Sequence, residues 1–191
     1  MSDLTLKKKE AKAKKMMLLF ALLSITMTFG GLTSAYVVSK GRPDWLVDFT
    51  LPISFTYSTI LLVISSVTIH CAKLFLTKQN GKSKSLNFLW ATFVLGIAFL
   101  FFQFNGFNDF INQGYYFAGA QSNVTTSFIY VLAFVHILHL IAGLIVLSVL
   151  IYKTYNNKYQ DSNLGFSLGV TFWHFLDLLW LYLFLFFYFF G

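Results

Sequence analysis

The chain has 191 residues, of which 57% are hydrophobic and only 11% are charged, and its formal net charge is +7. A soluble domain carries about 25% charged residues, so a chain this short could not hide its apolar surface from water, and its solvent must be lipid. The positive charges lie in short stretches between apolar runs, which favours a membrane surface over nucleic acid as their partner, and the single cysteine, Cys71, excludes an internal disulfide and a zinc ribbon.

Five segments of the chain are long and apolar enough to span a membrane. A spanning helix needs about 20 mostly apolar residues, because the hydrocarbon core is about 30 Å thick. The segments run from Met16 to Val38, from Pro52 to Leu76, from Leu86 to Gly106, from Thr126 to Tyr152 and from Phe166 to Phe190. We therefore expect an all-α polytopic membrane protein, with a basic cytoplasmic tail at residues 1–15 and a bundle of five transmembrane helices at residues 16–191.

The basic residues lie almost entirely on one side of this arrangement. With five spans, the N-terminal tail, the second connection and the fourth connection share a side, and they hold 12 of the 14 Lys and Arg residues. The opposite side has only Lys40 and Arg42. Because cytoplasmic loops are enriched in Lys and Arg, we expect the N-terminus in the cytoplasm and the C-terminus outside.

The first two expected helices each contain one group of residues that suggests a contact. In the first, Thr26, Gly30 and Ser34 recur every four residues, and such a stripe of small residues lets another helix approach closely in lipid. In the second, His70 and Lys73 lie near the expected cytoplasmic end. We interpret this pair as a contact for lipid headgroups.

The last two expected helices carry polar residues at membrane depth, where such groups are costly and therefore informative. The fourth holds His136, His139 and Gly143, and offsets of three and seven residues place them on one face. Gly143 would allow close packing of a neighbouring helix. The fifth holds His174 and Asp177, three residues apart and at a similar depth. A contact between Asp177 and a histidine would fit this spacing.

Three interpretations of His136, His139, His174 and Asp177 compete. They could form a buried polar network that locks the last two helices together, and Asp177→Ala would then harm assembly by about 1–3 kcal/mol, because it leaves histidines unpaired. They could bind zinc or iron, for which histidine and carboxylate are good ligands. They could relay protons, although the apolar residues on either side argue against a complete path within this chain. A transporter is disfavoured, because the sequence has neither internal repeats nor interrupted helices.

Two motifs carry a family resemblance: TFWHFLDLLWLYLF, from Thr171 to Phe184, and HILHLIAG, from His136 to Gly143. Both resemble signatures in the last two helices of subunit III of haem-copper respiratory oxidases, the cytochrome c oxidase subunit III family. Weaker similarity in the same register is found in LPISFTYSTILLVISSVT, from Leu51 to Thr68, and in LGIAFLFFQ, from Leu95 to Gln103. The resemblance covers nearly all of the chain from Met17 onward.

The resemblance implies a non-catalytic subunit that binds no haem or copper itself. It would pack mainly against subunit I, accompany subunit II, hold phospholipids and support proton uptake, within a bacterial inner-membrane complex that reduces O₂ and pumps protons. Haem and copper would reside in the partner subunits, and a respiratory supercomplex is a further partner that the resemblance allows. Cytochrome c is the expected electron donor and quinol the alternative. A stand-alone membrane metalloenzyme remains the alternative from a different class.

The sequence departs from the family pattern in three places. Many members have seven helices, and this chain matches only the last five. Many members carry a Ser-Glu pair in the helix that matches the first one here, where this chain has Ser24 and Ile25. A family Glu shortly after the glutamine of the third helix is also absent, and Asn105, Gly106 and Phe107 stand in that neighbourhood. A proton-related role of the Ser-Glu glutamate therefore cannot be carried over.

Overall fold

The computed structural model describes residues 3–43, 45–46, 51–78, 81–119, 123–159 and 163–190. Its long elements are five α-helices, which is the expected form for a chain in lipid, because a helix satisfies its backbone hydrogen bonds internally. They are α1 (Asp3–Val38), α2 (Ile53–Leu76), α3 (Lys82–Asn112), α4 (Val124–Tyr155) and α5 (Leu164–Phe190), with a short 3-10 turn, η1 (Ser39–Gly41), after α1. All five are long and apolar enough to cross a membrane, which confirms the predicted all-α class and the five predicted spans.

The helices extend beyond the apolar segments that predicted them. The largest difference is in α1, which begins at Asp3 and not at Met16. The intervening residues are mostly Lys, Ala, Leu and Glu, which are good helix formers, so the helix continues past the apolar segment. The described part of the predicted basic tail is therefore a helical extension of the first span.

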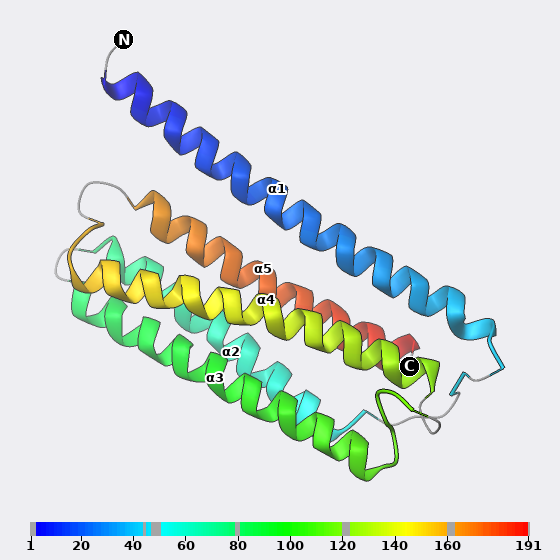
Figure 1. Ribbon diagram of the computed structural model, residues 1–191. Helices are drawn as coiled ribbons and strands as arrows, with labels where there is room; N and C mark the ends of the chain where they lie inside the picture. Colours follow the sequence, from blue (N-terminus) through cyan, green and yellow to red (C-terminus); the bar gives the residue numbers. More distant parts are fainter. Residues whose placement is uncertain are drawn as a thin grey trace.

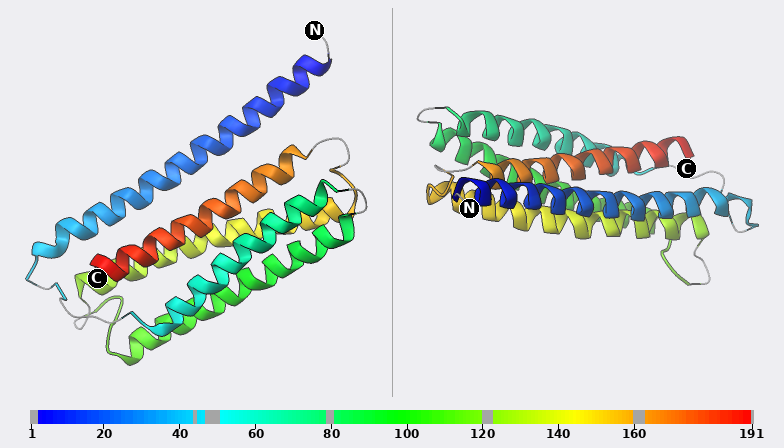
Figure 2. Two further views of the ribbon diagram at one scale, coloured as in Figure 1. Left: turned by 180° about the vertical axis from the view of Figure 1, so that it is seen from behind. Right: turned by 90° about the horizontal axis from the view of Figure 1, so that it is seen from above.

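The helices α2 to α5 lie side by side, and α1 runs along the outside of this group (Figure 1). The main contacts of α1 are with α4 and α5. These contacts are made by its C-terminal half, where Phe29, Thr33 and Tyr36 are buried. The N-terminal half of α1 stands apart from the other helices, as the left view of Figure 2 shows.

The two ends of the chain lie at opposite ends of the bundle (Figure 1), as an odd number of spans requires. The end that holds the N-terminus also holds the α2–α3 and α4–α5 connections, which the sequence analysis identified as the basic side. We call it the basic end. Its assignment to the cytoplasm stays a prediction.

Candidate functional site

Hydroxyl groups on α2 accept hydrogen bonds from two buried tryptophans of α5. The indole Nε1 of Trp173 donates to Oγ of Ser65 at 3.1 Å, and Nε1 of Trp180 donates to Oγ1 of Thr59 at 3.0 Å. Each hydroxyl also donates its own proton to a backbone carbonyl of α2. Both partners are thus satisfied, and α2 and α5 are joined by two polar contacts within an apolar interface, each of a kind that contributes about 0.6 kcal/mol in membrane proteins.

The helix α2 also makes polar contacts with α3. Nε2 of Gln103 donates to Oγ of Ser58 at 3.2 Å, and the hydroxyls of Thr68 and Thr92 lie 2.8 Å apart. Ser58, Thr92 and Gln103 are buried. Hydroxyl groups of α2 therefore bond to both neighbouring helices at several depths.

Trp173 occupies a narrow space between α3 and α4 that two glycines create. The side chain is only 1% exposed. A Cβ atom at Gly96 of α3 would lie 2.9 Å from Cη2 of Trp173, and one at Gly143 of α4 would lie 3.4 Å from its Cζ3 and 2.7 Å from Cδ1 of Leu176. The sequence analysis named Gly143 for close packing, and the structure places it against α5. It included Gly96 only in the segment LGIAFLFFQ of the family resemblance and did not predict close packing there, because an isolated glycine carries no spacing signal.

The small residues Thr26, Gly30 and Ser34 make no such contact within the described part of the chain. All three are exposed, and no neighbouring atom lies within 4 Å of a Cβ placed at Gly30. The chain buries the adjacent face of α1 instead, where Thr33 bonds to Tyr182 of α5 at 2.9 Å. Close packing at this stripe, if it is to occur, requires a partner chain.

His136 and His139 point to different neighbours. His136 is 0% exposed and packs against Trp180, with 5.1 Å between ring centroids, and against Phe99, with 5.9 Å. Neither of its ring nitrogens has a hydrogen-bond partner among the described residues. His139 faces Phe29 of α1 at 5.7 Å, and its Nδ1 lies 2.8 Å from the backbone carbonyl oxygen four residues earlier. A three-residue offset leaves about 60° between two side chains, which is enough to direct them at different helices.

His174 and Asp177 of α5 lie near α2. Nδ1 of His174 is 2.7 Å from Oγ of Ser66, and its ring centroid is 5.9 Å from that of His70. Asp177 is 8% exposed. The Ser66 hydroxyl lies beside this carboxyl group, but neither carboxyl oxygen makes a hydrogen bond of good geometry to a described residue. Polar side chains of α2 and α5 therefore lie along the contact between these two helices, from His70 to Asp177.

Among the described residues, no hydrogen bond joins the four members of the predicted polar network to one another, and the network stays a prediction. His139 bonds within α4 and His174 bonds to α2, while the other two have no hydrogen-bond partner in the described ranges. No described hydrogen bond joins Asp177 to a histidine, and the expected cost of Asp177→Ala stays a prediction. Within the described residues, no three His, Cys, Asp or Glu side chains lie close enough together to bind one metal ion. The four candidate ligands therefore do not form a ligand set, and they are His136, His139, His174 and Asp177.

The residues predicted to contact lipid headgroups lie at the end of α2 toward the basic end of the bundle. His70 is exposed and Lys73 is half-buried. Their positions suit a headgroup contact, which stays a prediction.

Comparisons with known proteins place most of the chain in one family. The family model described as cytochrome c oxidase subunit III matches residues 12–191. Cytochrome c oxidase subunit 3 from Thermostichus vulcanus is 28% identical over 172 residues, which are 87% of this chain and 82% of the relative. Cytochrome bo(3) ubiquinol oxidase subunit 3 from Pseudomonas aeruginosa is 32% identical over 165 residues, which are 84% of this chain and 77% of the relative.

Proposed function

The chain belongs to the cytochrome c oxidase subunit III family, and we propose from this premise that it serves as subunit III of a haem-copper terminal oxidase in a bacterial inner membrane. The family match along residues 12–191, on a chain with five membrane-spanning helices, is the observation that carries the proposal. Cytochrome c is the donor we propose, and ubiquinol is the alternative, because relatives of both kinds match.

The proposed role is to stabilise subunit I, with subunit II nearby, and to support proton uptake and lipid binding while the partner subunits reduce O₂. Two features of the chain support a non-catalytic role. Its buried polar groups are used mostly in contacts between its own helices. The outer face of α1, with Thr26, Gly30 and Ser34 exposed, is open to close packing by a helix of a partner subunit. We propose that the basic end faces the cytoplasm, because it holds 12 of the 14 basic residues.

We expect the tagged chain, extracted from its native membrane in a mild detergent, to bring down subunits that contain haem and copper. The measurement is the reduced-minus-oxidised visible spectrum of the eluate, with metal analysis, and an unrelated tagged membrane protein from the same cells serves as control. Oxidation of cytochrome c or of quinol by the eluate identifies the donor. Elution without haem, or stoichiometric metal bound to the isolated chain, would contradict the proposal.

We expect Asp177→Asn to change the stability of the complex by less than about 1 kcal/mol. The amide has the same shape as the carboxyl group, and neither carboxyl oxygen of Asp177 has a hydrogen-bond partner among the described residues. Oxygen consumption per haem should equal that of wild type, since the proposed role of the chain is not chemical. The matched control is His174→Ala, which removes a partner of Ser66. Normal yield of the Asp177→Asn complex with abolished oxygen consumption would instead assign Asp177 to a proton relay.

A further inference from the structure

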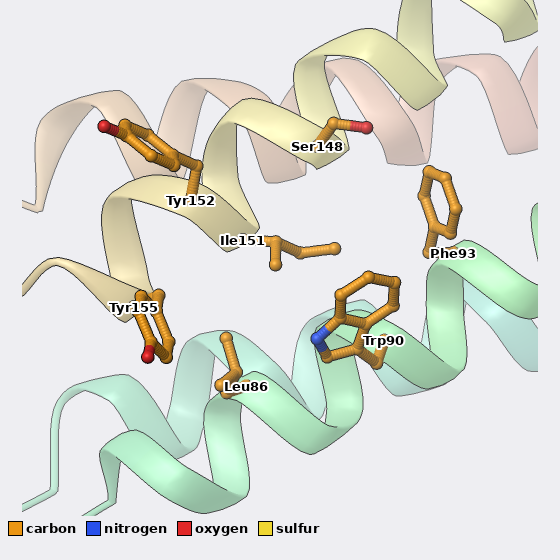
Figure 3. Close-up of a pocket in the computed structure, with 7 residues that line it drawn as sticks. All are labelled: Leu86, Trp90, Phe93, Ser148, Ile151, Tyr152 and Tyr155. Atoms are coloured by element: carbon orange, nitrogen blue, oxygen red, sulfur yellow. The ribbon is translucent and has the colours of Figure 1, made fainter.

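Two hollows on the surface of the described chain differ in chemistry. The first lies between α3 and α4 near the basic end, and Figure 3 shows aromatic and aliphatic side chains along it, among them Trp90 and Tyr155. No charged residue lines this hollow, so charge indicates no occupant for it. The second hollow lies at the opposite end of the bundle, where α2 begins and α3 ends, and it contains a carboxylate.

The second hollow, which we call the acidic pocket, has a volume of about 360 Å³. Its lining residues are Pro52 and Ile53 at the start of α2, and Asp109, Asn112 and Gln113 at the end of α3. Offsets of three and four residues place the last three on one face of the helix end. A carboxylate, two amides and two apolar side chains therefore border the same space.

The carboxylate of Asp109 is oriented by a hydrogen bond from α2. Oγ of Ser54 donates to Oδ2 of Asp109 at 2.6 Å, so Oδ1 can accept from another donor. Asp109 is half-buried, and no described Lys or Arg forms an ion pair with it. Lys40, at the same end of the bundle, lies over the ring of Phe190 instead, with its Nζ 5.3 Å from the ring centroid.

The position of Asp109 in α3 favours a positive charge beside it. Asp109 lies in the last turn of the helix, where a cation is favoured over an anion, because the C-terminal end of a helix is partially negative. That turn contains no basic residue. Asp109 is also the only Asp, Glu, Lys or Arg in residues 51–72 and 85–119, which cover most of α2 and α3. A positive charge that stabilises this carboxylate therefore has to come from outside the described chain.

The chemistry of the acidic pocket favours a basic side chain over a metal ion or a lipid headgroup. Calcium takes about six to eight oxygen ligands, and no three His, Cys, Asp or Glu side chains gather among the described residues. An ethanolamine headgroup would bring its phosphate close to Asp109, and residues 51–72 and 85–119 contain no Lys or Arg to neutralise that phosphate. A Lys or Arg side chain brings a positive charge alone. Its donors match the carboxylate and amide oxygens, and its apolar stem can lie along Pro52 and Ile53.

We propose that the acidic pocket binds one Lys or Arg side chain of a neighbouring subunit, which forms an ion pair with Asp109 and hydrogen bonds with the side-chain oxygens of Asn112 and Gln113. This inference rests on the proposed function for the presence of a neighbouring subunit. The contact lies on α2 and α3, whereas the exposed stripe of small residues lies on α1, so the chain meets its partners on two separate surfaces.

The first experiment uses the complete complex with the photoreactive residue p-benzoylphenylalanine in place of Ile53, which is 66% exposed and borders the pocket. Irradiation joins this residue to the molecule that occupies the pocket, and mass spectrometry identifies the adduct. We expect a peptide of another subunit that carries Lys or Arg within about four residues, or one helical turn, of the attachment point. The control position is Val94, which is 61% exposed on α3. It lies about 22 Å along the helix from Asp109 and should not capture this peptide.

The second experiment changes the charge of the pocket and measures the yield of the same crosslink. Asp109→Asn keeps the shape of the side chain, and we expect the yield to fall about fivefold or more, because one member of a charge pair is removed. Glu10→Gln makes the same change of charge on an exposed residue of α1 at the basic end and should leave the yield at its wild-type value. Asp109→Lys should lower the yield further, because two positive charges then meet. Exchange of the captured Lys or Arg for Asp, combined with Asp109→Lys, should restore the yield to within about twofold of wild type.

Four results would overturn the proposal: an adduct with lipid and no polypeptide, a captured peptide without Lys or Arg near the attachment point, an unchanged yield in Asp109→Asn, or no recovery on charge exchange. The haem spectrum of the same preparation separates these results from failure of the proposed function. A basic peptide captured in a preparation without haem would refute the oxidase assignment and support the pocket. Haem without capture would support the oxidase assignment and overturn the pocket.

Discussion

Trp173→Ala is expected to lower the free energy of unfolding of this chain by about 3–5 kcal/mol, the range for removing a large buried aromatic side chain. Trp173 is 1% exposed and contacts three helices besides its own. Its indole nitrogen bonds to Ser65 of α2, and its ring lies against the glycine positions Gly96 of α3 and Gly143 of α4. The truncation removes these contacts together, and the surrounding helices can only partly close the cavity that remains.

The effect can be measured by titrating the chain from mild detergent into SDS and following helix content and tryptophan fluorescence. Trp173→Phe should fall between wild type and alanine, since it keeps an aromatic ring but loses the hydrogen bond to Ser65, which is worth about 0.6 kcal/mol in a membrane protein. Trp90→Ala is the matched control, because Trp90 is 50% exposed, and it should cost less than about 1 kcal/mol. Similar costs for Trp90→Ala and Trp173→Ala would show that Trp173 does not join the helices.

The number of spans could be predicted from the sequence, because the apolar length of a segment is a local property. The ends of the helices could not be predicted as well. The helix α1 starts at Asp3, since helix-forming residues continue it beyond the apolar segment. The basic side could also be located, because the alternation of ends follows directly from the number of spans.

The partners of the polar residues could not be predicted, because they depend on the rotation of each helix about its axis. The periodicity of α4 places His136 and His139 on one broad face, but the packing directs His136 at α5 and His139 at α1. Ser66 of α2, which bonds to His174, gave no signal, since one serine in an apolar segment resembles many others. The family motif identified α5 as the helix with the most informative residues, and the structure adds that α2 supplies most of its polar partners.

Replacing different glycines of this chain by alanine should change the free energy of unfolding by different amounts, depending on which atoms surround each glycine. Gly96→Ala is expected to cost about 1–3 kcal/mol of unfolding free energy. Its new methyl group would lie 2.9 Å from the Trp173 ring, and that ring is held in place by its hydrogen bond to Ser65. Gly143→Ala should cost less, because the closest atom, at 2.7 Å, is the end of the flexible Leu176 side chain.

Gly30→Ala is the internal control of this series, and it separates the two interpretations of the small residues on α1. No atom lies within 4 Å of the added Cβ, and alanine favours a helix over glycine by about 1 kcal/mol. The isolated chain should therefore be unchanged or slightly more stable, as measured by the same SDS titration. If the stripe of Thr26, Gly30 and Ser34 packs against a partner subunit, Gly30→Leu should leave the isolated chain stable but lower the amount of haem that elutes with it. A loss of stability in the isolated Gly30→Ala chain would contradict the outward orientation of this face, and unchanged haem recovery in Gly30→Leu would place the partner contact on another surface.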